Sequence, residues 1–361
     1  MKLRVILVTI AGTGLVVGGL CLFLFEQLAA TRAQDSEAAL RSLANQVEEE
    51  IGGTARDLAA RADLIAQMPP IRAALAEQDR PALVALLGES YAALNARYGL
   101  TNAQVNSAVT NTVLHRFHSP NNAGDDFARN RQIIVTAHGA NQAQMGVEIG
   151  ASGVRVRGAA PVGSGRVLGS VEFGVELQPL LEALRARTNA DFAILIERRL
   201  IPTTTTGDVH LFGALRGDSA TNWPLVAALH ETRAITLVKE SAFSFSTIQG
   251  IPYGTATFPL LDYSGAEIGV IIAMTSLAPE QRSLRRLAVA TAAAGLIAWI
   301  GMAGIILLLF RGLILRPVSV IAEALETPAG ATPPPSLPKP GAAAELDRLI
   351  RAAARTREAA P

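Results

Sequence analysis

The sequence predicts an α+β protein in which a long N-terminal helix and two tandem antiparallel-sheet modules are flanked by two transmembrane helices. Two long runs contain no Asp, Glu, Lys or Arg, and each is about the length that crosses a bilayer as a helix: Val5 to Phe25 and Leu287 to Phe310. Between these runs, helical periodicity gives way to strand-like alternation. One strand-turn-strand pattern recurs one hundred positions later, which indicates two similar modules.

Residues 1–25 are expected to form a retained membrane anchor. Lys2 and Arg4 at its start fit an anchor and a cleaved signal peptide equally well. The apolar run is longer than the core of about 7–15 residues in a signal peptide, and no small-x-small cleavage site follows it. These two observations favour the anchor.

Residues 26–94 are expected to form a long helix and two short ones. The long helix, 26–67, carries apolar residues at helical spacing: Leu40, Leu43, Val47 and Ile51. The prolines after Met68 stop it, and shorter helices are predicted at 71–77 and 81–97. An ordinary amphipathic helix that breaks at Gly52-Gly53 is the alternative.

The pattern changes its period over residues 95–195, which are expected to form the first module. Strands are predicted at 111–118, 145–149, 154–162, 166–177 and 192–197, and helices at 125–139 and 179–188. The sequence Gly163-Ser-Gly165 predicts a hairpin turn. Asp125 or Asp126 is expected to cap the helix that follows.

Residues 196–286 are expected to form the second module because they repeat part of the first. Gly165, Gly169, Val171, Leu177 and Pro179 match Gly265, Gly269, Ile271, Leu277 and Pro279, and Pro161 matches Pro259. The matches fall on residues that make turns and punctuate strands, where a shared hairpin would place them.

The second apolar run, 287–310, has the Gly, Ala and Trp residues of a membrane helix packed against another helix. Residues 311–361 follow as two short amphipathic helices joined by a Pro-rich connector, and these helices need each other and a second copy of the chain. Basic residues flank both ends of the apolar run: Arg311 and Arg316 follow it, and Arg282, Arg285 and Arg286 precede it. The charge bias is therefore weak, and the size of the middle segment favours its placement outside the cytoplasm.

Composition and motifs argue against several classes of function. A net charge of +1 shows no nucleic-acid footprint, and Cys21 is the only cysteine, so no disulfide forms within one chain. No P-loop, Ser-His-Asp set or zincin motif is present, so neither an enzyme nor a cofactor is expected. His115 and His118 would point to opposite faces of a strand, which argues against a metal site.

Charged residues in the first module point to a polar binding site. Arg155 and Arg157 share one face of their predicted strand, and Glu172 and Glu176 share one face of the next. The opposite, apolar face would pack on the long helix. Arginine forks suit carboxylates, and nearby Asp and Glu side chains could hold an ammonium group. The pattern favours a small carboxylate or an amino-acid-like zwitterion, with a surface hairpin of solvated charges or a structural Arg–Glu ladder as the alternatives.

Several motifs resemble the double-Cache sensor domains of bacterial chemoreceptors and sensor kinases: Arg116-Phe-His118-Ser-Pro120, Gly124-Asp-Asp126, Arg131, Gly146-Val-Glu148-Ile-Gly150, Arg157-Gly158, Pro161-Val162 and Gly169-Ser-Val-Glu172-Phe-Gly174. The resemblance covers about residues 30–280 in layout. It implies two PAS-like (Cache) modules, a homodimer and a small-molecule ligand in the membrane-distal module. The ligand-binding residues expected there are His118, Asp126, Arg131, Glu148, Arg155, Arg157 and Glu172.

The tail resembles a HAMP linker, with Arg316-Pro317 opening its first helix and Glu345-Leu346 its second, although the connector is longer and richer in proline than usual. We therefore expect a sensory receptor of the bacterial inner membrane with two transmembrane helices, a periplasmic sensor domain and no catalytic output. Such receptors carry a signalling domain after the HAMP helices, whereas this chain ends at Pro361, so a cytoplasmic signalling partner is expected. The alternatives are a non-catalytic membrane subunit that senses a periplasmic protein, a truncated chemoreceptor or histidine kinase, a remnant of one, and a membrane-tethered hydrolase.

Overall fold

A computed structural model describes residues 2–128, 131–150, 153–201, 210–233, 235, 237–316, 318, 319, 322, 348, 352 and 355. The chain divides into two compact units, Met1–Arg32 with Gln281–Pro361, and Ala33–Glu280. Helix α1 (Lys2–Ala66) contributes to both units. Most of the tail predicted to be HAMP-like lies outside the described residues.

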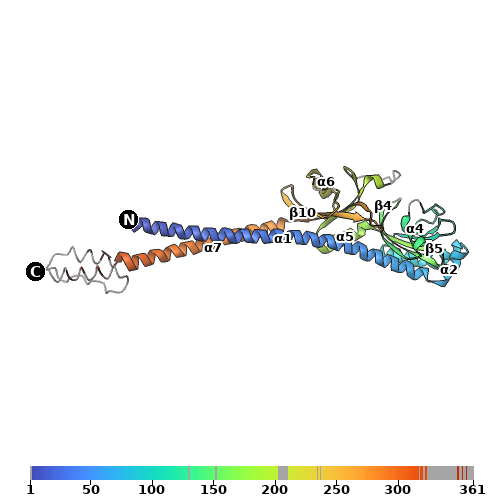
Figure 1. Ribbon diagram of the computed structural model, residues 1–361, viewed down its shortest axis with the longest axis horizontal. Coiled ribbons are helices and arrows are strands. Elements are labelled where there is room, and N and C mark those ends of the chain that lie inside the picture. The colour runs from blue at the N-terminus through green and yellow to red at the C-terminus, as the bar shows by residue number, and fades with distance from the viewer. Residues whose placement is uncertain are drawn as a thin grey trace. The chain divides into compact units, whose positions relative to one another are not determined.

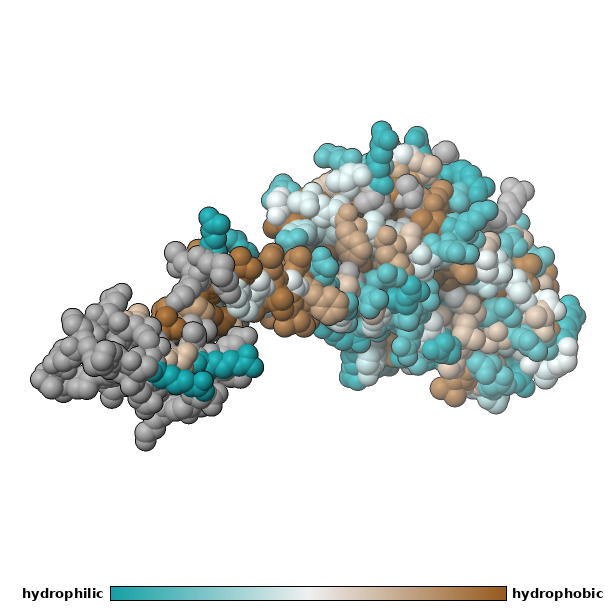
Figure 2. Space-filling model, turned by 60° about the vertical axis from the view of Figure 1, so that its left-hand side comes forward, coloured by the Kyte–Doolittle hydropathy of each residue, from teal (hydrophilic) through white to brown (hydrophobic). Residues whose placement is uncertain are grey.

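In the first unit, the beginning of α1 packs against α7 (Ala278–Phe310), and a π-helix, Arg311–Leu315, follows α7. The Trp299 indole N–H donates to the Ile10 carbonyl at 3.0 Å, and a Cβ at Gly14 would lie 2.8 Å from that nitrogen. Small residues thus let the two helices approach closely. Both helices are long and apolar enough to cross a membrane. Figure 2 shows hydrophobic side chains gathered on this part of the molecule. Leu15, Val16, Ile297 and Leu308 are among the exposed large hydrophobic residues of the two helices.

The second unit contains two antiparallel sheets, as the fold class predicted (Figure 1). The first has the order β2-β1-β5-β4-β3, with β1 Asn102–Ser107, β2 Thr112–Arg116, β3 Gln144–Gly150, β4 Gly153–Ser164 and β5 Arg166–Glu176. The second has the order β7-β8-β6-β11-β10-β9, with β6 Asp191–Glu197, β7 Leu211–Phe212, β8 Leu215–Ala220, β9 Ala242–Ile248, β10 Ile251–Leu261 and β11 Glu267–Ser276. The first five strands therefore recur in the same order in the second sheet.

The sequence repeat corresponds to a structural repeat. Gly165 and Gly265 both adopt a φ of 85° in the turns before β5 and β11, a backbone conformation that favours glycine. A Cβ at Gly169 would lie 2.0 Å from the Asn106 carbonyl oxygen. A Cβ at Gly269 would lie 2.1 Å from the corresponding oxygen of the neighbouring β6. The matching glycines thus have the same backbone conformation or the same close contact in both hairpins, which confirms the repeat.

Helix α1 lies along one face of both sheets (Figure 1). Its buried stripe includes Leu40, Val47, Leu58 and Ala62, and it passes through Gly52-Gly53 without a break, so the long helix is confirmed. A Cβ at Gly158 would lie 2.1 Å from the Ala59 backbone nitrogen, so glycine permits this close approach. The remaining helices are α2 Pro69–Ala76, α3 Arg80–Tyr98, α4 Gln132–Ala140, α5 Leu177–Thr188, α6 Trp223–Glu231 and the 3₁₀ helix Arg198–Leu200.

The structure corrects one local prediction and adds detail to two others. The helix predicted from Asp125 begins only at Gln132, and the Asp126 carboxylate instead accepts the Ala128 N–H in a turn, so the capping prediction was wrong. Strand β1 was not predicted. Strand β6 pairs with β11 and β8, so the second sheet begins before residue 195.

Candidate functional site

A cavity of about 550 Å³ lies over the face of the first sheet that points away from α1. Strand β1, the end of β2, the loop that follows it and β4 supply its lining: Asn102, Gln104, Arg116, His118, Ser119, Asn121, Asn122, Ala123, Asp125, Asp126, Arg131 and Arg157. The alternation of the strands explains the separation of faces. Glu172 pairs across the strands with Gln104 on the cavity side, while Val171 and Phe173 belong to the core shared with α1.

Two arginines, Arg157 buried and Arg131 partly buried, and two buried glutamates form the floor of this cavity. The Arg131 Nε–H donates to Glu148 Oε2 at 2.8 Å, and its Nη2 also contacts Glu172. Arg157 donates from Nη1 to Glu172 Oε1 at 2.8 Å and lies 3.4 Å from Glu148 through Nε. The side chains of Arg157 and Glu172 are 2% and 1% exposed. Charges this deeply buried require partners, and the four groups neutralise one another.

The arginines of this tetrad, defined as Arg131, Arg157, Glu148 and Glu172, keep hydrogen-bonding capacity. A guanidinium carries five N–H groups. Within the described residues, the ion pairs of Arg131 engage Nε and Nη2 only. Because Arg131 lines the cavity, its remaining N–H groups are positioned to donate to a bound acceptor.

Burial disfavours the charged form of both arginines and so lowers their pKa values. Burial, followed by the positive charge of Arg131, lowers the pKa of Arg157 well below its usual range, and the Glu148 carboxylate partly opposes this. Burial also lowers the pKa of Arg131, and the Glu148 carboxylate raises it. Arginine stays protonated in proteins, so the floor presents two cations held by two carboxylates.

Glu148 links the cavity to helix α4. Its Oε1 accepts the Ile133 N–H at 2.9 Å while its Oε2 accepts from Arg131. This carboxylate from β3 therefore satisfies a free N–H in the first turn of α4 and complements the helix dipole. It takes the role that the sequence suggested for Asp125 or Asp126.

A chain of neutral side chains continues the network along β1. The Gln104 amide donates to Glu172 Oε2 and to Asn106 Oδ1, both at 2.9 Å. The Asn106 amide donates to the Ser170 hydroxyl at 3.1 Å. All four side chains are buried, so these contacts satisfy groups that would otherwise be costly to bury.

The loop over the cavity is tied down by a bidentate ion pair. Arg116 donates from its two terminal nitrogens to the two Asp125 oxygens at 2.6 and 2.8 Å, and these hydrogen bonds lower the pKa of Asp125. His118 contacts the Asn102 amide at 3.1 Å. Burial lowers the pKa of His118, so it is neutral at pH 7. Asp126 is exposed and lines the cavity.

The corresponding face of the second sheet is apolar. Gln104, Asn106, Ser170 and Glu172 in the first sheet correspond by register to Ala193, Leu195, Val270 and Ile272. These four are buried in a hydrophobic cluster with residues of α6, including Leu225, Val226 and Leu229. The Trp223 ring fills the space over Gly217, where a Cβ would lie 2.3 Å from the ring. Only the first of the two modules thus has a charged cavity at this place among the described residues.

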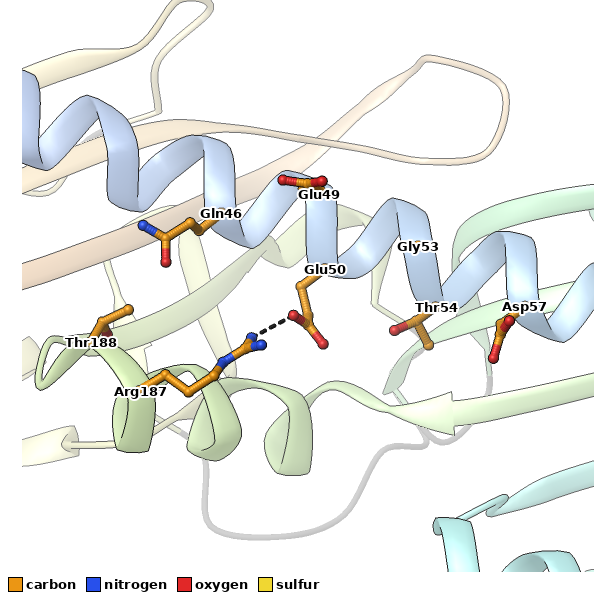
Figure 3. A pocket seen from close by; sticks show the side chains of 8 residues that line it. All are labelled: Gln46, Glu49, Glu50, Gly53, Thr54, Asp57, Arg187 and Thr188. Carbon is orange, nitrogen blue, oxygen red and sulfur yellow. Dashed lines mark hydrogen bonds and ion pairs between the residues drawn. The ribbon is translucent and has the colours of Figure 1, made fainter.

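A second hollow of about 550 Å³ lies between α1 and α5 (Figure 3). It is lined by Gln46, Glu49, Glu50, Gly53, Thr54, Asp57, Arg187 and Thr188. Arg187, its only lining cation, pairs with Glu50, and its side chain is 58% exposed. The acidic side chains would repel a carboxylate, and their solvent exposure weakens any ion pair formed there. The cavity of the first module is the better candidate for an anionic ligand.

Six of the seven side chains expected at a binding site meet at this cavity. His118, Asp126, Arg131 and Arg157 line it, and Glu148 and Glu172 hold the two arginines. Arg155 pairs with Glu176 at 2.9 Å and is not in the lining.

Several lining residues were not expected at a binding site from the sequence, among them Asn102, Gln104 and Arg116. Asn102 and Gln104 lie on β1, which was not predicted because its residues are mostly polar. Their alternation with Ala103 and Val105 was the signal that could have identified the strand. Arg116 occurs in a motif of the sequence, and only the fold brings it to Asp125.

The arrangement suits reversible binding of a polar molecule. Arginine and amide N–H groups can donate to a carboxylate, and Asp125 and Asp126 can accept from an ammonium group. No group of three or more His, Cys, Asp or Glu side chains that could hold a metal ion occurs among the described residues. His115 accepts from Arg80 at 3.1 Å and packs edge-on against Phe117.

Comparisons with known proteins agree with this fold. The family model dCache_3, described as a double sensory domain of two-component sensor kinase, matches residues 33–277. No curated protein matches the chain. Similar solved structures include a Vibrio parahaemolyticus domain described as belonging to the sensory box/GGDEF family, with 12% identity, a TM-score of 0.43, and coverage of 69% of this chain and 99% of that one.

Two further solved structures are similar to the chain at comparable levels. One is the ligand-binding domain of the Campylobacter jejuni chemoreceptor Tlp3 in complex with L-valine, with 11% identity, a TM-score of 0.42, and coverage of 70% of this chain and 96% of that one. The other is the sensor domain of the Vibrio cholerae histidine kinase DctB, with 10% identity, a TM-score of 0.39, and coverage of 64% and 94%. The family match spans most of the chain and both sheets, and this protein belongs to the dCache_3 family of double-Cache sensory domains.

Proposed function

We propose that this protein is a membrane-anchored sensor that binds a small carboxylate or an amino-acid-like zwitterion in the cavity of its first module. The observation that carries the proposal is the tetrad of Arg131, Arg157, Glu148 and Glu172, buried at the floor of a cavity of ligand size. Burying four charges costs free energy unless they are paired. A binding site is a reason to retain them, since the second module has apolar residues at the same register.

The charges around the cavity suggest how such a ligand would lie. A carboxylate would accept from the N–H groups of Arg131 and from the neighbouring amide of Asn102. An ammonium group, where present, would lie toward Asp125 and Asp126 at the loop. Both ends would then exchange hydrogen bonds with water for hydrogen bonds with the protein, which gives specificity more than affinity.

The proposed signal passes from the cavity to the second module through the turn before β11. Glu148 joins the arginines to α4. Tyr263, in that turn, contacts both β3 and α4. Its N–H donates to the Val147 carbonyl of β3 at 2.9 Å, and its hydroxyl lies 3.2 Å from the Thr136 hydroxyl of α4. Its ring also packs on the cluster that contains Phe127 and Ile133.

Strand β11 leads directly from this turn to the membrane. It ends at Ser276, and α7 begins at Ala278. A ligand that binds one arrangement of α4 and the arginines more tightly than another would shift the population of positions of β11 and α7. Differential affinity is the energy source for that shift.

The remaining features of the proposal concern the cell. We place the two transmembrane helices in a bacterial inner membrane, with the sensory domain in the periplasm. The chain would act as a homodimer, and a HAMP-like tail would pass the signal to a cytoplasmic partner. The receptor role itself involves no catalysis.

A thermal-shift screen of the full chain in detergent tests the proposal. Matched series of monocarboxylates, dicarboxylates, amino acids, amines and neutral sugars would be compared. A ligand at about one hundred times its dissociation constant adds about 2.7 kcal/mol to the free energy of unfolding, a shift of several degrees. We expect hits only among carboxylates or amino acids. Hits confined to amines or sugars, or no hit in a folded sample, would contradict the proposal, and the latter would favour a protein as the signal.

A further inference from the structure

Three arginines form a basic cluster at the beginning of α7. Arg282, Arg285 and Arg286 are spaced three and four residues apart, so they share one face of the helix, and Val289 continues that face. Together they line a hollow of about 350 Å³. All three arginines are exposed. We call these three residues the arginine cluster.

The cluster is not neutralised by neighbouring carboxylates. None of the ion pairs between described side chains involves these arginines. Glu280 is the acidic residue in the first turn of α7, two positions from Arg282. Positions two apart do not face each other on a helix. The cluster therefore presents three positive charges to its surroundings.

The position of the cluster fixes the layer of the membrane that it meets. The apolar run begins at Leu287, directly after Arg286. At about 1.5 Å per residue, Arg282 lies roughly 7 Å beyond the beginning of that run. The headgroup layer on each side of the hydrocarbon is about 5–7 Å thick. With the edge of the hydrocarbon at Leu287, Arg285 and Arg286 would lie within the layer that contains the lipid phosphates, and Arg282 would lie at its outer edge.

Charge statistics make this placement unusual. Membrane proteins concentrate Lys and Arg on the cytoplasmic side of their helices. Arg311 and Arg316, at the opposite end of the same apolar run, follow that bias, whereas the cluster adds three arginines at the other mouth. A function for the cluster explains why these charges are present on the side where the bias would remove them.

We propose that Arg282, Arg285 and Arg286 bind the phosphate groups of anionic phospholipids in the outer leaflet. Guanidinium forks match phosphate oxygens in bidentate geometry, and Val289 lies one turn further, where an acyl chain begins. A zwitterionic headgroup carries its own cation and satisfies the cluster less well. Bound lipid would set the depth of α7, the helix through which the sensory domain is joined to the tail. The inference rests on the proposed function in placing α7 in a membrane with the sensory domain in the periplasm.

Native mass spectrometry of the full chain tests the inference directly. The protein would be purified from vesicles with equal amounts of phosphatidylglycerol and phosphatidylcholine, and the retained lipids counted. A basic residue at a membrane surface strengthens the binding of anionic lipid about fivefold. The triple variant R282Q/R285Q/R286Q should therefore lose its preference for phosphatidylglycerol by at least about tenfold, and added salt should weaken the wild-type preference.

A matched control removes equal charge elsewhere. The variant R198Q/R199Q/R216Q lies in the second module and should retain the wild-type lipid ratio. An unchanged ratio in the cluster variant, or an equal loss in the control, would overturn the inference. No preference for phosphatidylglycerol in the wild type would do the same. The measurement uses no sensory ligand, so a failed carboxylate screen leaves it standing. Conversely, the cluster variant should still show the thermal shift caused by a bound carboxylate, so loss of lipid binding does not test the proposed ligand site.

Discussion

At the scale of single residues, the tetrad is expected to affect both the stability of the fold and the proposed ligand binding. Each arginine of the tetrad is held by both glutamates, so no member can be removed without leaving a buried charge uncompensated. The network is also connected to neutral amides on β1 through Gln104. Such a network holds its arginines in one geometry before a ligand arrives, which reduces the ordering cost of binding.

Replacing Glu172 by Gln should destabilise the protein by about 3–5 kcal/mol, because it leaves a buried guanidinium without its anion. Chemical unfolding of the full chain in detergent, followed by circular dichroism, measures the change. Glu176→Gln is the control, since its side chain is 44% exposed and pairs with Arg155. That variant should lose less than about 1 kcal/mol. Equal losses in the two variants would show that the tetrad is not a buried charge network.

His138 predicts a pH dependence of stability. Burial lowers the pKa of His138 from 6.5 to about 4, and its ring packs edge-on against Phe127. Between those two values the unfolded chain binds a proton at this histidine and the folded chain does not. The stability contribution is therefore complete above pH 6.5 and is lost as the pH falls toward 4.

The variant His138→Gln separates this histidine from the other titrating groups. The wild type should lose stability more steeply than the variant between pH 6.5 and 4, measured as the unfolding midpoint at half-unit steps. Parallel curves for the two proteins would show that His138 does not titrate as proposed.

The sequence was informative about charged residues and poor about neutral ones. Arginine and glutamate at alternating positions of β4 and β5 stand out against apolar neighbours, and six of the seven expected residues meet at the cavity. Asn102 and Gln104 are small amides in a polar strand, so composition masked their period. The pairing of Arg116 with Asp125 depends on a nine-residue loop closure that no local pattern encodes.

At the scale of elements, the close contact between α1 and the first sheet depends on glycine. A Cβ at Gly158 would overlap the backbone of α1 near Ala59. Overpacking of a close contact costs about 1–3 kcal/mol, and more where backbone must move. Gly158→Ala should lower the unfolding midpoint accordingly.

Gly139→Ala is the matched control for that prediction. Gly139 lies in α4 with no atom near the position of a new Cβ. Alanine has the higher helix propensity, so the midpoint should stay unchanged or rise. A neutral Gly158→Ala would show that α1 does not pack against the sheet as closely as described.

Tyr263 is the element contact through which the modules should communicate. Tyr263→Ala removes the ring from the α4 cluster and its hydroxyl from Thr136. We expect ligand affinity within about twofold of the wild type and no ligand-induced change in cross-linking rate between cysteines introduced in α7. Ser264→Ala in the same turn should keep the response. A normal response in Tyr263→Ala would place the coupling elsewhere.

Element types followed from periodicity more readily than their boundaries. The long helix, the β4–β5 hairpin and the repeated glycines were predicted because each has a strong local pattern. The beginning of α4 was misplaced by seven residues because Glu148, distant in sequence, satisfies its first turn, and Asp126 makes a turn instead. A cap supplied by another strand leaves no local signal.

At the scale of the whole molecule, two copies of one sheet order have divided their roles. The first sheet keeps a polar face under a cavity, and the second fills the same face with apolar side chains under α6. The repeat was visible in the sequence through its turns, whereas the difference between the two faces became clear only from the register of the strands. Among the described residues, the division leaves a charged cavity in the first module, where we propose that the ligand binds, and a second module whose strand β11 is followed by α7.

The most direct test is a titration of the full chain with a carboxylate or amino acid identified by the screen, comparing Arg131→Gln with Arg187→Gln. These arginines line two hollows of similar size, and both variants remove one charge. The account predicts at least about tenfold weaker binding in Arg131→Gln, because a charge-assisted hydrogen bond contributes about 1.5–3 kcal/mol, and affinity within about twofold in Arg187→Gln. Unchanged affinity in a folded Arg131→Gln, or a loss only in Arg187→Gln, would contradict the assignment of the ligand to the first module.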